Sequence, residues 1–221
     1  MKVPAKIPRI VKWVYPDVTW QIPNSENAVY LTFDDGPTPE ITDWVLAELK
    51  KFNAKGTFFL IGNNVAQHPE IVANIREAGH SIGNHCYNHE KGWATSRENY
   101  FASVAKTNAL LNTKLFRPPY GRIKRNQIEV LKNDYTIVMW DVLSHDYDKN
   151  FTPQECVANV INNAKSGSII VFHDSVKAWP NLKVALPIVL KQLSSQGFVF
   201  KELWNTKLPY LNPAMKIGGK W

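Results

Sequence analysis

Residues 28–40, AVYLTFDDGPTPE, join an apolar run to two adjacent acids and then to the start of a helix. The apolar run predicts a buried strand. Thr38 followed by Pro39 matches an N-cap with proline in the first helical turn, so we predict a helix to about residue 52. Asp34 and Asp35 close the strand with two like charges, which is costly unless each carboxylate has its own partner. The stretch therefore predicts a strand–turn–helix unit whose acid pair needs partners from elsewhere in the chain.

The rest of the chain repeats this alternation of short apolar runs and helical patterns. Further strands are predicted at 56–62, 80–85, 114–119, 135–142, 167–174 and 198–203. Two of the intervening helices show a capping-box pattern, Thr95 with Glu98 and Thr152 with Glu155. The first of these helices is predicted to begin at Ser96 or Thr95. The alternation favours a parallel sheet buried on both faces, and about six or seven units in one domain favour an α/β barrel over an open sheet.

No repeat, low-complexity tract or linker divides the chain, so we expect one main domain. We predict an N-terminal arm packed on the domain over 1–27, the main domain over 28–206, and a C-terminal tail over 207–221. The first residues are basic but interrupted by prolines, so we do not expect a signal peptide. We also see no apolar run of about 18 residues that would cross a bilayer. The expected location is cytoplasmic or peripheral to a membrane.

Composition indicates an ordinary soluble globular protein, with 44% hydrophobic and 20% charged residues. The net charge of +7 allows an anionic partner, but no Lys/Arg-rich run is present, so we expect no nucleic acid. The Lys, Arg, Trp and Tyr residues of the arm allow peripheral contact with a membrane surface. Cys86 and Cys156 have neither metal-pair spacing nor a disulfide pattern. Composition leaves the oligomeric state open.

Polar residues follow the ends of several predicted strands, and in an α/β barrel the carboxyl ends of the strands form the active face. These residues are Asp34, Asp35, His85, Arg117, Asp141, His173 and Asp174. Taken singly, each has a structural explanation, such as a helix cap for an Asp or a salt bridge for Arg117. Their shared position at strand ends instead indicates a site.

His85 and His89 are four residues apart, a spacing that can bring two imidazoles onto one metal ion. Asp35 can supply a third ligand. Two histidines and a carboxylate suit Zn²⁺ best, although Co²⁺, Ni²⁺ and Mn²⁺ can accept the same set. Asp34 is then a candidate base, held by Arg117 in a bidentate pair, and His173 is a candidate acid. The backbone N–H of Tyr120, stiffened by the preceding prolines, is a candidate oxyanion donor.

Four motifs in this order, TFDDGP, HCYNH, RPPYG and VFH, resemble the polysaccharide deacetylase family, the carbohydrate esterases (family 4) that share the NodB homology domain. The resemblance runs from about Val29 to Leu203. It implies a distorted (β/α) barrel of about seven or eight strands and one divalent metal ion, most often Zn²⁺. By motif position the resemblance implies that Asp34 is the base and that Arg117 orients it. It implies that Tyr120 is the oxyanion donor and His173 the acid. The implied metal ligands are Asp35, His85 and His89, and the implied pocket for the acetyl methyl is lined by Trp140 and Val171.

The sequence departs from the family pattern in three places. Cys86 stands where Ser or Thr is usual, and Val171 replaces Leu. The third departure is LSHDY, residues 143–147, where the family has a motif like Asp-x-x-Asp-Trp and only Asp146 fits. In the family an acid there tunes the catalytic histidine. Three outcomes are open: Asp141 takes that role, Asp146 takes it, or His173 lacks its usual partner.

The resemblance implies a hydrolase that removes N-acetyl groups from glycans containing N-acetylglucosamine, with metal-activated water, Asp34 as base and His173 as acid. One alternative keeps the chemistry and changes the substrate, to a lipid-linked sugar or an O-acetylated glycan. The other alternative is a barrel that binds sugar without catalysis, and only the altered motif at 143–147 favours it.

Overall fold

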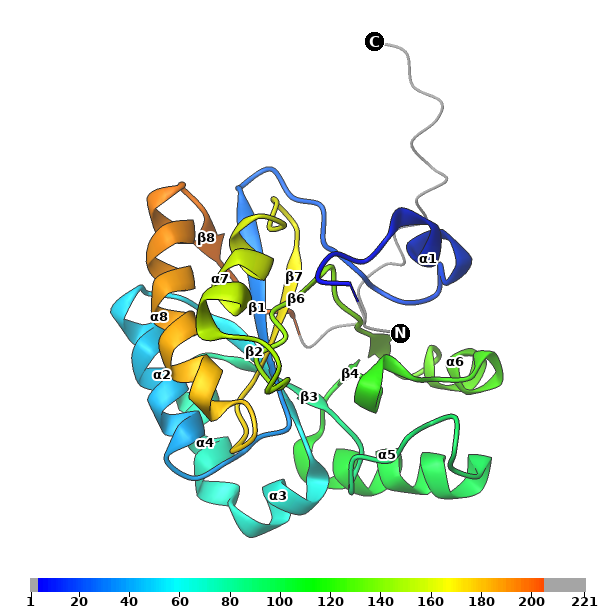
Figure 1. Cartoon of the computed structure of the whole chain (residues 1–221). Helices are drawn as coiled ribbons and strands as arrows, with labels where there is room; N and C mark the ends of the chain where they lie inside the picture. The colour runs from blue at the N-terminus through cyan, green and yellow to red at the C-terminus, as the bar shows by residue number, and fades with distance from the viewer. Residues whose placement is uncertain (1–3, 205–221) are drawn as a thin grey trace.

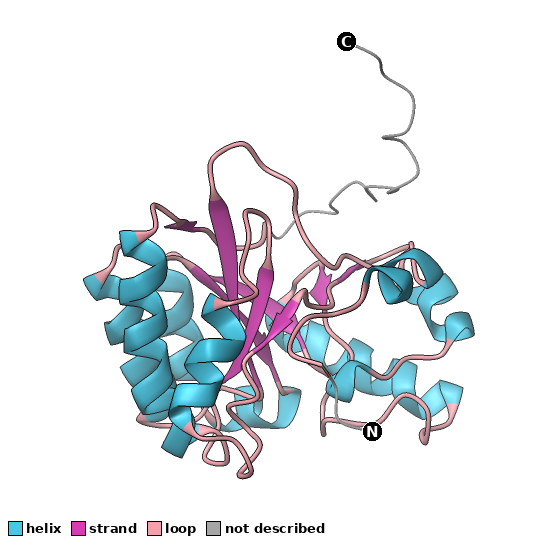
Figure 2. Cartoon of the chain, turned by 45° about the horizontal axis from the view of Figure 1, so that its top comes forward, coloured by secondary structure: helices cyan, strands magenta, loops and turns pink. Residues whose placement is uncertain are grey.

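A computed structural model describes residues 4–204 of the 221-residue chain. Its strands are β1 (Ala28–Asp34), β2 (Gly56–Leu60), β3 (Ser81–Asn84), β4 (Leu115–Phe116), β5 (Thr136–Ile137), β6 (Val142–Leu143), β7 (Ile169–His173) and β8 (Val199–Phe200). Its helices are α1 (Arg9–Val14), α2 (Ile41–Lys51), α3 (Gly62–Gln67), α4 (Pro69–Glu77), α5 (Arg97–Leu111), the 3₁₀ turn η1 (Pro119–Gly121), α6 (Arg125–Leu131), α7 (Pro153–Ile161) and α8 (Trp179–Ser195). Strands and helices alternate along the chain, and the helices lie around a central sheet (Figures 1 and 2).

The sheet confirms the predicted barrel type. Its strands follow the order β5-β4-β3-β2-β1-β7-β6, and β8 pairs with the start of β1. All of these pairings are parallel. Seven strands curl into a half-barrel with helices outside it. Since the strands are parallel, their carboxyl ends meet at one rim, which is where a site is expected in such folds.

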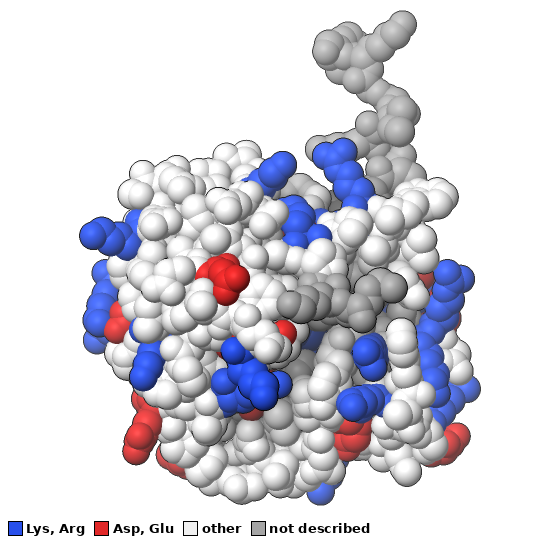
Figure 3. Space-filling view, in the orientation of Figure 1, with Lys and Arg blue, Asp and Glu red and all other residues white. Residues whose placement is uncertain are grey.

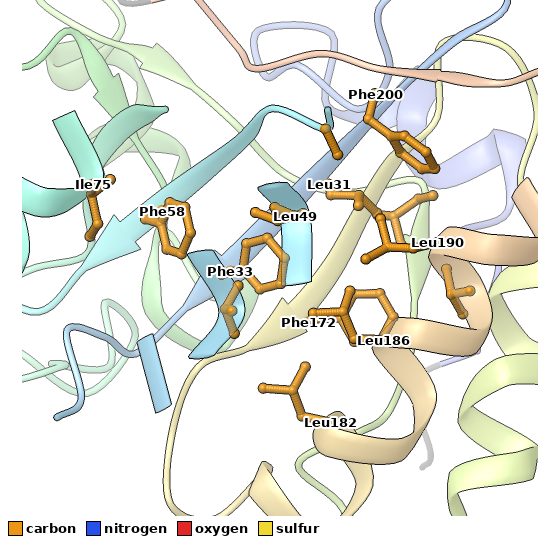
Figure 4. Packing of buried hydrophobic residues seen from close by; sticks show 14 of the residues in the cluster. Leu31, Phe33, Leu49, Phe58, Ile75, Phe172, Leu182, Leu186, Leu190 and Phe200 are labelled. Atoms are coloured by element: carbon orange, nitrogen blue, oxygen red, sulfur yellow. The ribbon is translucent and has the colours of Figure 1, made fainter. Parts of the chain in front are cut away.

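Strand β1 lies at the centre of the core, and every one of its residues is buried. On one face Phe33 stacks on Phe58 and Phe172, with ring centroids 5.0 and 6.3 Å apart (Figure 4). Leucines of α2 and α8 pack on this face, among them Leu49 and Leu186. A second apolar cluster includes other residues of the same strands, among them Tyr30 and Phe59. Burial on both faces explains why the strand sequences are apolar runs rather than alternating patterns.

The prediction of one strand over 135–142 is wrong. The segment contains β5 and β6, which lie at opposite ends of the sheet order, and residues 138–141 cross between them. The crossing residues bond to other partners: the carbonyls of Val138 and Met139 accept hydrogen bonds from Arg117, at 3.3 and 3.0 Å. The N–H of Met139 donates to the carbonyl of Thr19 at 2.8 Å. An apolar run shows that a segment is buried, but it does not show where its backbone bonds go.

The N-terminal arm is bonded along this crossing segment. Leu143 N donates to Ala5 O at 2.8 Å, Ile7 N to Asp141 O at 3.1 Å, and Thr19 N to Ile137 O at 2.8 Å. Residues 5–19 therefore lie beside the chain that joins the two ends of the curled sheet. We keep the division into arm (1–27), main domain (28–206) and tail (207–221) as a proposal; the tail lies outside the described residues.

Asp141 anchors the arm. Its carboxylate is 2% exposed and accepts from Lys6 Nζ at 2.5 Å, from Ser168 Oγ at 2.5 Å, and from Lys12 Nζ. Burial alone would raise the pKa of Asp141, but these donors hold it below its usual value. Two lysines from the arm thus converge on one buried acid at the end of the crossing segment.

The surface of the described part is basic but mixed. On the face shown in Figure 3, Lys and Arg side chains lie over many elements, with Asp and Glu between them. Within residues 4–204 we find no helix of the length and apolarity that spanning a membrane requires.

We predict that Asp141→Ala lowers the free energy of unfolding by about 3 kcal/mol, because it leaves two lysines facing a buried site without their acid. The pKa of Asp141 is depressed in the folded state, so its contribution is present above about pH 4 and is lost as pH falls through the folded value. Urea unfolding at pH 7 and pH 3 measures both effects. The matched control is Asp17→Ala, also in the arm, whose pair with Lys132 at 3.5 Å is partly exposed; it should cost less than about 1 kcal/mol. Equal losses for the two variants would contradict the anchor role.

Candidate active site

The structure brings most of the predicted site residues to the rim formed by the carboxyl ends of the strands. Asp34 and His173 are the last residues of the neighbouring strands β1 and β7 and are paired in register. His85 follows β3, and Arg117 follows β4. Parallel pairing thus gathers residues more than a hundred positions apart in sequence at one place.

The two adjacent acids diverge because of the backbone between them. Asp34 is still in the strand, whereas Asp35 has φ 80°, in the left-handed region. Left-handed backbone is costly for a residue other than glycine, so surrounding contacts must hold it. Asn64 Nδ2 supplies one of them, donating to the carbonyl of Asp35 at 2.9 Å. The change in backbone direction lets neighbours in sequence take different partners.

Asp174, one of the polar residues predicted at strand ends, holds the following turn, a role that the sequence did not assign to it. Its fully buried carboxylate accepts from Gly36 N at 3.1 Å and from Thr42 Oγ1 at 2.6 Å, and its N–H donates to Asp34 O at 3.1 Å. A Cβ at Gly36 would lie 2.1 Å from Asp174 Oδ2, so only glycine fits there. Burial raises the pKa of Asp174 to about 8. Its position directly after His173 was the only sequence signal for this role.

Asp34 is held by Arg117. Arg117 is fully buried, and its Nη1 donates to Asp34 Oδ1 at 2.7 Å and to Thr32 Oγ1 at 2.8 Å. The predicted bidentate geometry is wrong, because Nη2 donates to Met139 O instead. The guanidinium also lies 4.1 Å from the centroid of the Phe59 ring. With its donors fixed on several sides, Arg117 sets the orientation of Asp34.

Asp35, His85 and His89 form a cluster of metal-binding geometry. Asp35 Oδ1 lies 3.2 Å from His89 Nε2 and 3.7 Å from His85 Nε2, and one ligand atom from each residue lies within 4.8 Å of the others. His85 Nδ1 is 2.7 Å from Arg117 O. A carbonyl only accepts, so Nδ1 carries the proton and Nε2 keeps a lone pair toward the cluster.

The protonation states in the cluster also suit a cation. Burial lowers the pKa of His85 to about 4, which leaves the imidazole neutral. Burial acts to raise the pKa of Asp35, but the hydrogen bond from His89 and the charges of the nearby histidines lower it below its usual value. Imidazole nitrogens together with an ionised carboxylate are a donor set that Zn²⁺ and similar divalent ions accept. The residues present therefore fit one divalent metal ion.

His173 has an acidic partner despite the departure at 143–147. Asp146 Oδ1 lies 2.8 Å from His173 Nδ1, and Asp146 Oδ2 accepts from His173 N at 2.8 Å. Ser144 Oγ donates to Asp146 Oδ1 at 2.9 Å. Burial would lower the pKa of His173, but Asp146 outweighs it and raises the pKa to about 9. Of the open alternatives, the structure selects Asp146, because Asp141 is engaged by the arm.

The three residues predicted to contact the substrate differ in their exposure. Tyr120 is 53% exposed, with φ 60°, and its ring centroid is 4.5 Å from that of His89. Trp140 and Val171 are buried, and a Cβ at Gly121 would lie 2.4 Å from the Trp140 ring. Trp140 Nε1 is buried without a hydrogen-bond partner among the described residues. The roles of these three residues stay predictions.

A surface cavity of about 440 Å³ opens beside the metal-binding cluster. Trp140 and Val171 do not line this cavity. Its lining residues are Asp35, Pro37, Thr38, Pro39, Ile61, Asn64, His68, His89, Ser175, Val176 and Lys177. The cluster is thus accessible to a substrate from this side.

Known proteins share both the sequence and the fold. The sequence profile of the family described as polysaccharide deacetylase matches residues 21–137. A peptidoglycan-N-acetylglucosamine deacetylase of Bacillus cereus is 36% identical over 189 residues, covering 82% of this chain and 68% of that protein. The crystal structure of the peptidoglycan N-acetylglucosamine deacetylase Bc1960 superposes with a TM-score of 0.81 at 34% identity, covering 87% of this chain and 94% of the other. A mutant of BA3943, described as a CE4 family pseudoenzyme with restored enzymatic activity, superposes with a TM-score of 0.73 at 26% identity, covering 83% and 68%.

We predict that Asp146→Asn lowers the pKa of His173, since it removes the carboxylate that raises this pKa to about 9. NMR titration of the His173 ring in the metal-free protein measures the shift. A raised folded pKa contributes stability that is complete below about pH 6.5 and lost as pH rises through about 9. The difference in the free energy of unfolding between the wild-type protein and Asp146→Asn should therefore narrow above pH 9. Asp134→Asn, an exposed acid, is the control, and an unshifted His173 in Asp146→Asn would contradict the assignment.

Proposed function

The chain belongs to the polysaccharide deacetylase family, and from this membership we propose that it removes N-acetyl groups from N-acetylglucosamine residues of a peptidoglycan-type glycan. It is a hydrolase of the carbohydrate esterase class. The names of the relatives support the substrate. One observation carries the assignment to this site: Asp34, fixed by Arg117, directly precedes Asp35 of the metal-binding cluster.

Asp35, His85 and His89 would hold one divalent ion, and Zn²⁺ is the best match to this donor set. When bound, such an ion lowers the pKa of water and polarises a carbonyl oxygen. His85 is oriented for ligation by its Nδ1 contact with Arg117 O at 2.7 Å. The same residue, Arg117, therefore positions both a ligand and the neighbouring Asp34.

The remaining chemistry falls to side chains already in place. Asp34 accepts a proton as water attacks the acetamide carbonyl, and Arg117 keeps its carboxylate oriented during the transfer. The Tyr120 N–H is the proposed donor to the developing oxyanion. His173, protonated at neutral pH because its pKa is raised to about 9, donates a proton to the leaving amine. The C–N bond breaks, and acetate and a free amino sugar result.

The alternatives keep part of this account. The same groups would also hydrolyse an O-acetyl ester or an acyl group on a lipid-linked sugar, since each reaction needs a base, an oxyanion donor and an acid. The third candidate function is a barrel that binds sugar without activity. Its support is the likeness to BA3943, a CE4 family pseudoenzyme of which a mutant has restored activity. Against it stands the complete set of Asp34, the metal-binding cluster and a charged His173.

We predict that Asp34→Asn lowers acetate release by about 10² to 10⁴, because the amide cannot accept the proton. The variant should still bind one Zn²⁺ per chain, whereas His85→Ala should lose both the metal and the activity. Acetate release from N-acetylglucosamine oligomers, together with metal content, separates the two effects. Asp43→Asn, an exposed acid of α2, is the control and should behave as wild type. Near-normal turnover by Asp34→Asn would overturn the assignment of the base.

We also propose that α1 contacts an anionic membrane surface. Its residues Ile10 and Trp13 are 63% and 69% exposed, and Arg9 lies on the same helix. Exposed apolar side chains beside basic ones are typical of interfacial segments. Trp13→Ala should reduce co-sedimentation with vesicles rich in anionic lipid by at least about twofold, while Trp93→Ala should not. Absence of binding by the wild-type protein would reject this contact.

A further inference from the structure

We propose that the loops carrying Lys91, Trp93, Tyr120 and Arg122 form an extended subsite that binds the sugars next to the target residue in a carboxylate-bearing glycan. The inference rests on the proposed function and deepens it. It names a binding surface beyond the metal-binding cluster and the class of polymer that surface fits.

The proposed subsite starts at the metal-binding cluster. The Tyr120 ring lies 4.5 Å from the ring of the ligand His89, and Lys91 Nζ lies 5.1 Å from the Tyr120 ring centroid. Trp93 follows two residues later in the same loop, and the Arg122 guanidinium lies 5.4 Å from its ring. Two aromatic and two basic side chains therefore continue outward from the place where the acetyl group would react.

The two loops are fastened to each other, so the surface is formed before any ligand arrives. Trp93 Nε1 donates to Ile123 O at 3.1 Å. The buried Gln127 donates to Gly92 O at 3.0 Å and accepts from Lys124 N at 2.8 Å. A Cβ at Gly92 would lie 2.6 Å from Arg122 O, so the close approach of the loops requires glycine. A surface held in this way binds with little loss of conformational entropy.

The exposure of these aromatic rings indicates a ligand. Trp93 is 57% exposed and Tyr120 is 53% exposed, although large aromatic side chains are usually well buried. Both have an apolar ring with a polar edge, which suits the apolar face and hydroxyl rim of a sugar. The indole N–H of Trp93 is already bonded within the protein, so its ring is the part left for contact.

The charges select an anionic polymer over a neutral one. Lys91 and Arg122 are both basic, and the acid of this loop, Glu90, is engaged by Ser103 Oγ at 2.6 Å and Asn88 N at 3.1 Å. The whole chain carries a net charge of +7. An oligomer of N-acetylglucosamine alone has no charge to match these cations. A peptidoglycan strand carries carboxylates on its lactyl and peptide substituents, which Arg binds well.

The test compares two glycans of equal length, a neutral N-acetylglucosamine oligomer and a peptidoglycan fragment with carboxylates on alternate sugars. Trp93→Ala should raise KM for both by about three- to tenfold with little change in kcat. Arg122→Gln should raise KM for the carboxylate-bearing fragment only, and raising NaCl to about 0.5 M should reduce the wild-type preference for that fragment. Trp93→Phe and Arg122→Lys should recover most of each loss. Trp204→Ala, another exposed tryptophan at 50%, is the matched control.

The outcomes separate this inference from the proposed function. Equal KM values for Trp93→Ala and Trp204→Ala, with both variants folded by thermal unfolding, would overturn the subsite. If the wild-type protein released no acetate from either glycan, the proposed function would fail. Calorimetric binding of the same fragments would then still test the subsite: weaker binding by Trp93→Ala and Arg122→Gln supports it, and unchanged binding rejects it.

Discussion

The site depends on the hydrogen bonds and the ion pair made by one buried group, the guanidinium of Arg117. A fully buried cation is costly unless all its donors are satisfied. Its partners are Asp34 and Thr32 on β1 and the carbonyls of residues 138 and 139 in the crossing segment. Its own carbonyl orients His85. One residue thus joins the central strand, the crossing segment, the candidate base and a candidate metal ligand. Buried ion pairs are weak stabilisers, so this arrangement is better explained by the chemistry it positions than by folding energy.

Backbone strain provides the second constraint. Asp35, His89 and Tyr120 have φ values of 80°, 58° and 60°. Each such conformation costs about 1–3 kcal/mol in a residue other than glycine and persists only where contacts enforce it. For Asp35 those contacts include Asn64 and the turn held by the buried Asp174. Six other non-glycine residues among those described also have positive φ, so such strain is not confined to this site. At Asp35 and His89, two members of the metal-binding cluster, it ties the contacts of the surrounding loops to the placement of the candidate ligands.

Local sequence signals predicted what depends on near neighbours. The strand at 28–33, the capping box of Thr152 and Glu155, and the barrel type were all visible in the sequence, and the structure has each of them. Of the two predicted starts of the helix at 97–111, Ser96 is confirmed as the N-cap, accepting from Asn99 N at 3.3 Å, and the capping box at Thr95 is wrong. The single strand at 135–142 failed for a different reason: its two halves pair with strands far away in sequence, and Thr19 and Arg117 supply the bonds between. The choice between Asp141 and Asp146 could not be made from spacing, because both lie within a few residues of the same strand and only their distant partners distinguish them.

The departure at 143–147 shows how a site can change its sequence and keep its geometry. Leu143, where the family has an acid, lies in β6 opposite Val171 and is 2% exposed, so its position belongs to the core. Asp146 accepts both the backbone N–H and the Nδ1–H of His173, so the other ring proton of the charged imidazole is on Nε2. Asp146 contributes most to the rise in the pKa of His173 to about 9, and the charges of Asp35 and Asp34 add to it. Asp34 has a cation as its partner and His173 has an anion. The candidate base and the candidate acid are therefore each paired with a buried side chain of opposite charge, and the two partners come from different parts of the chain.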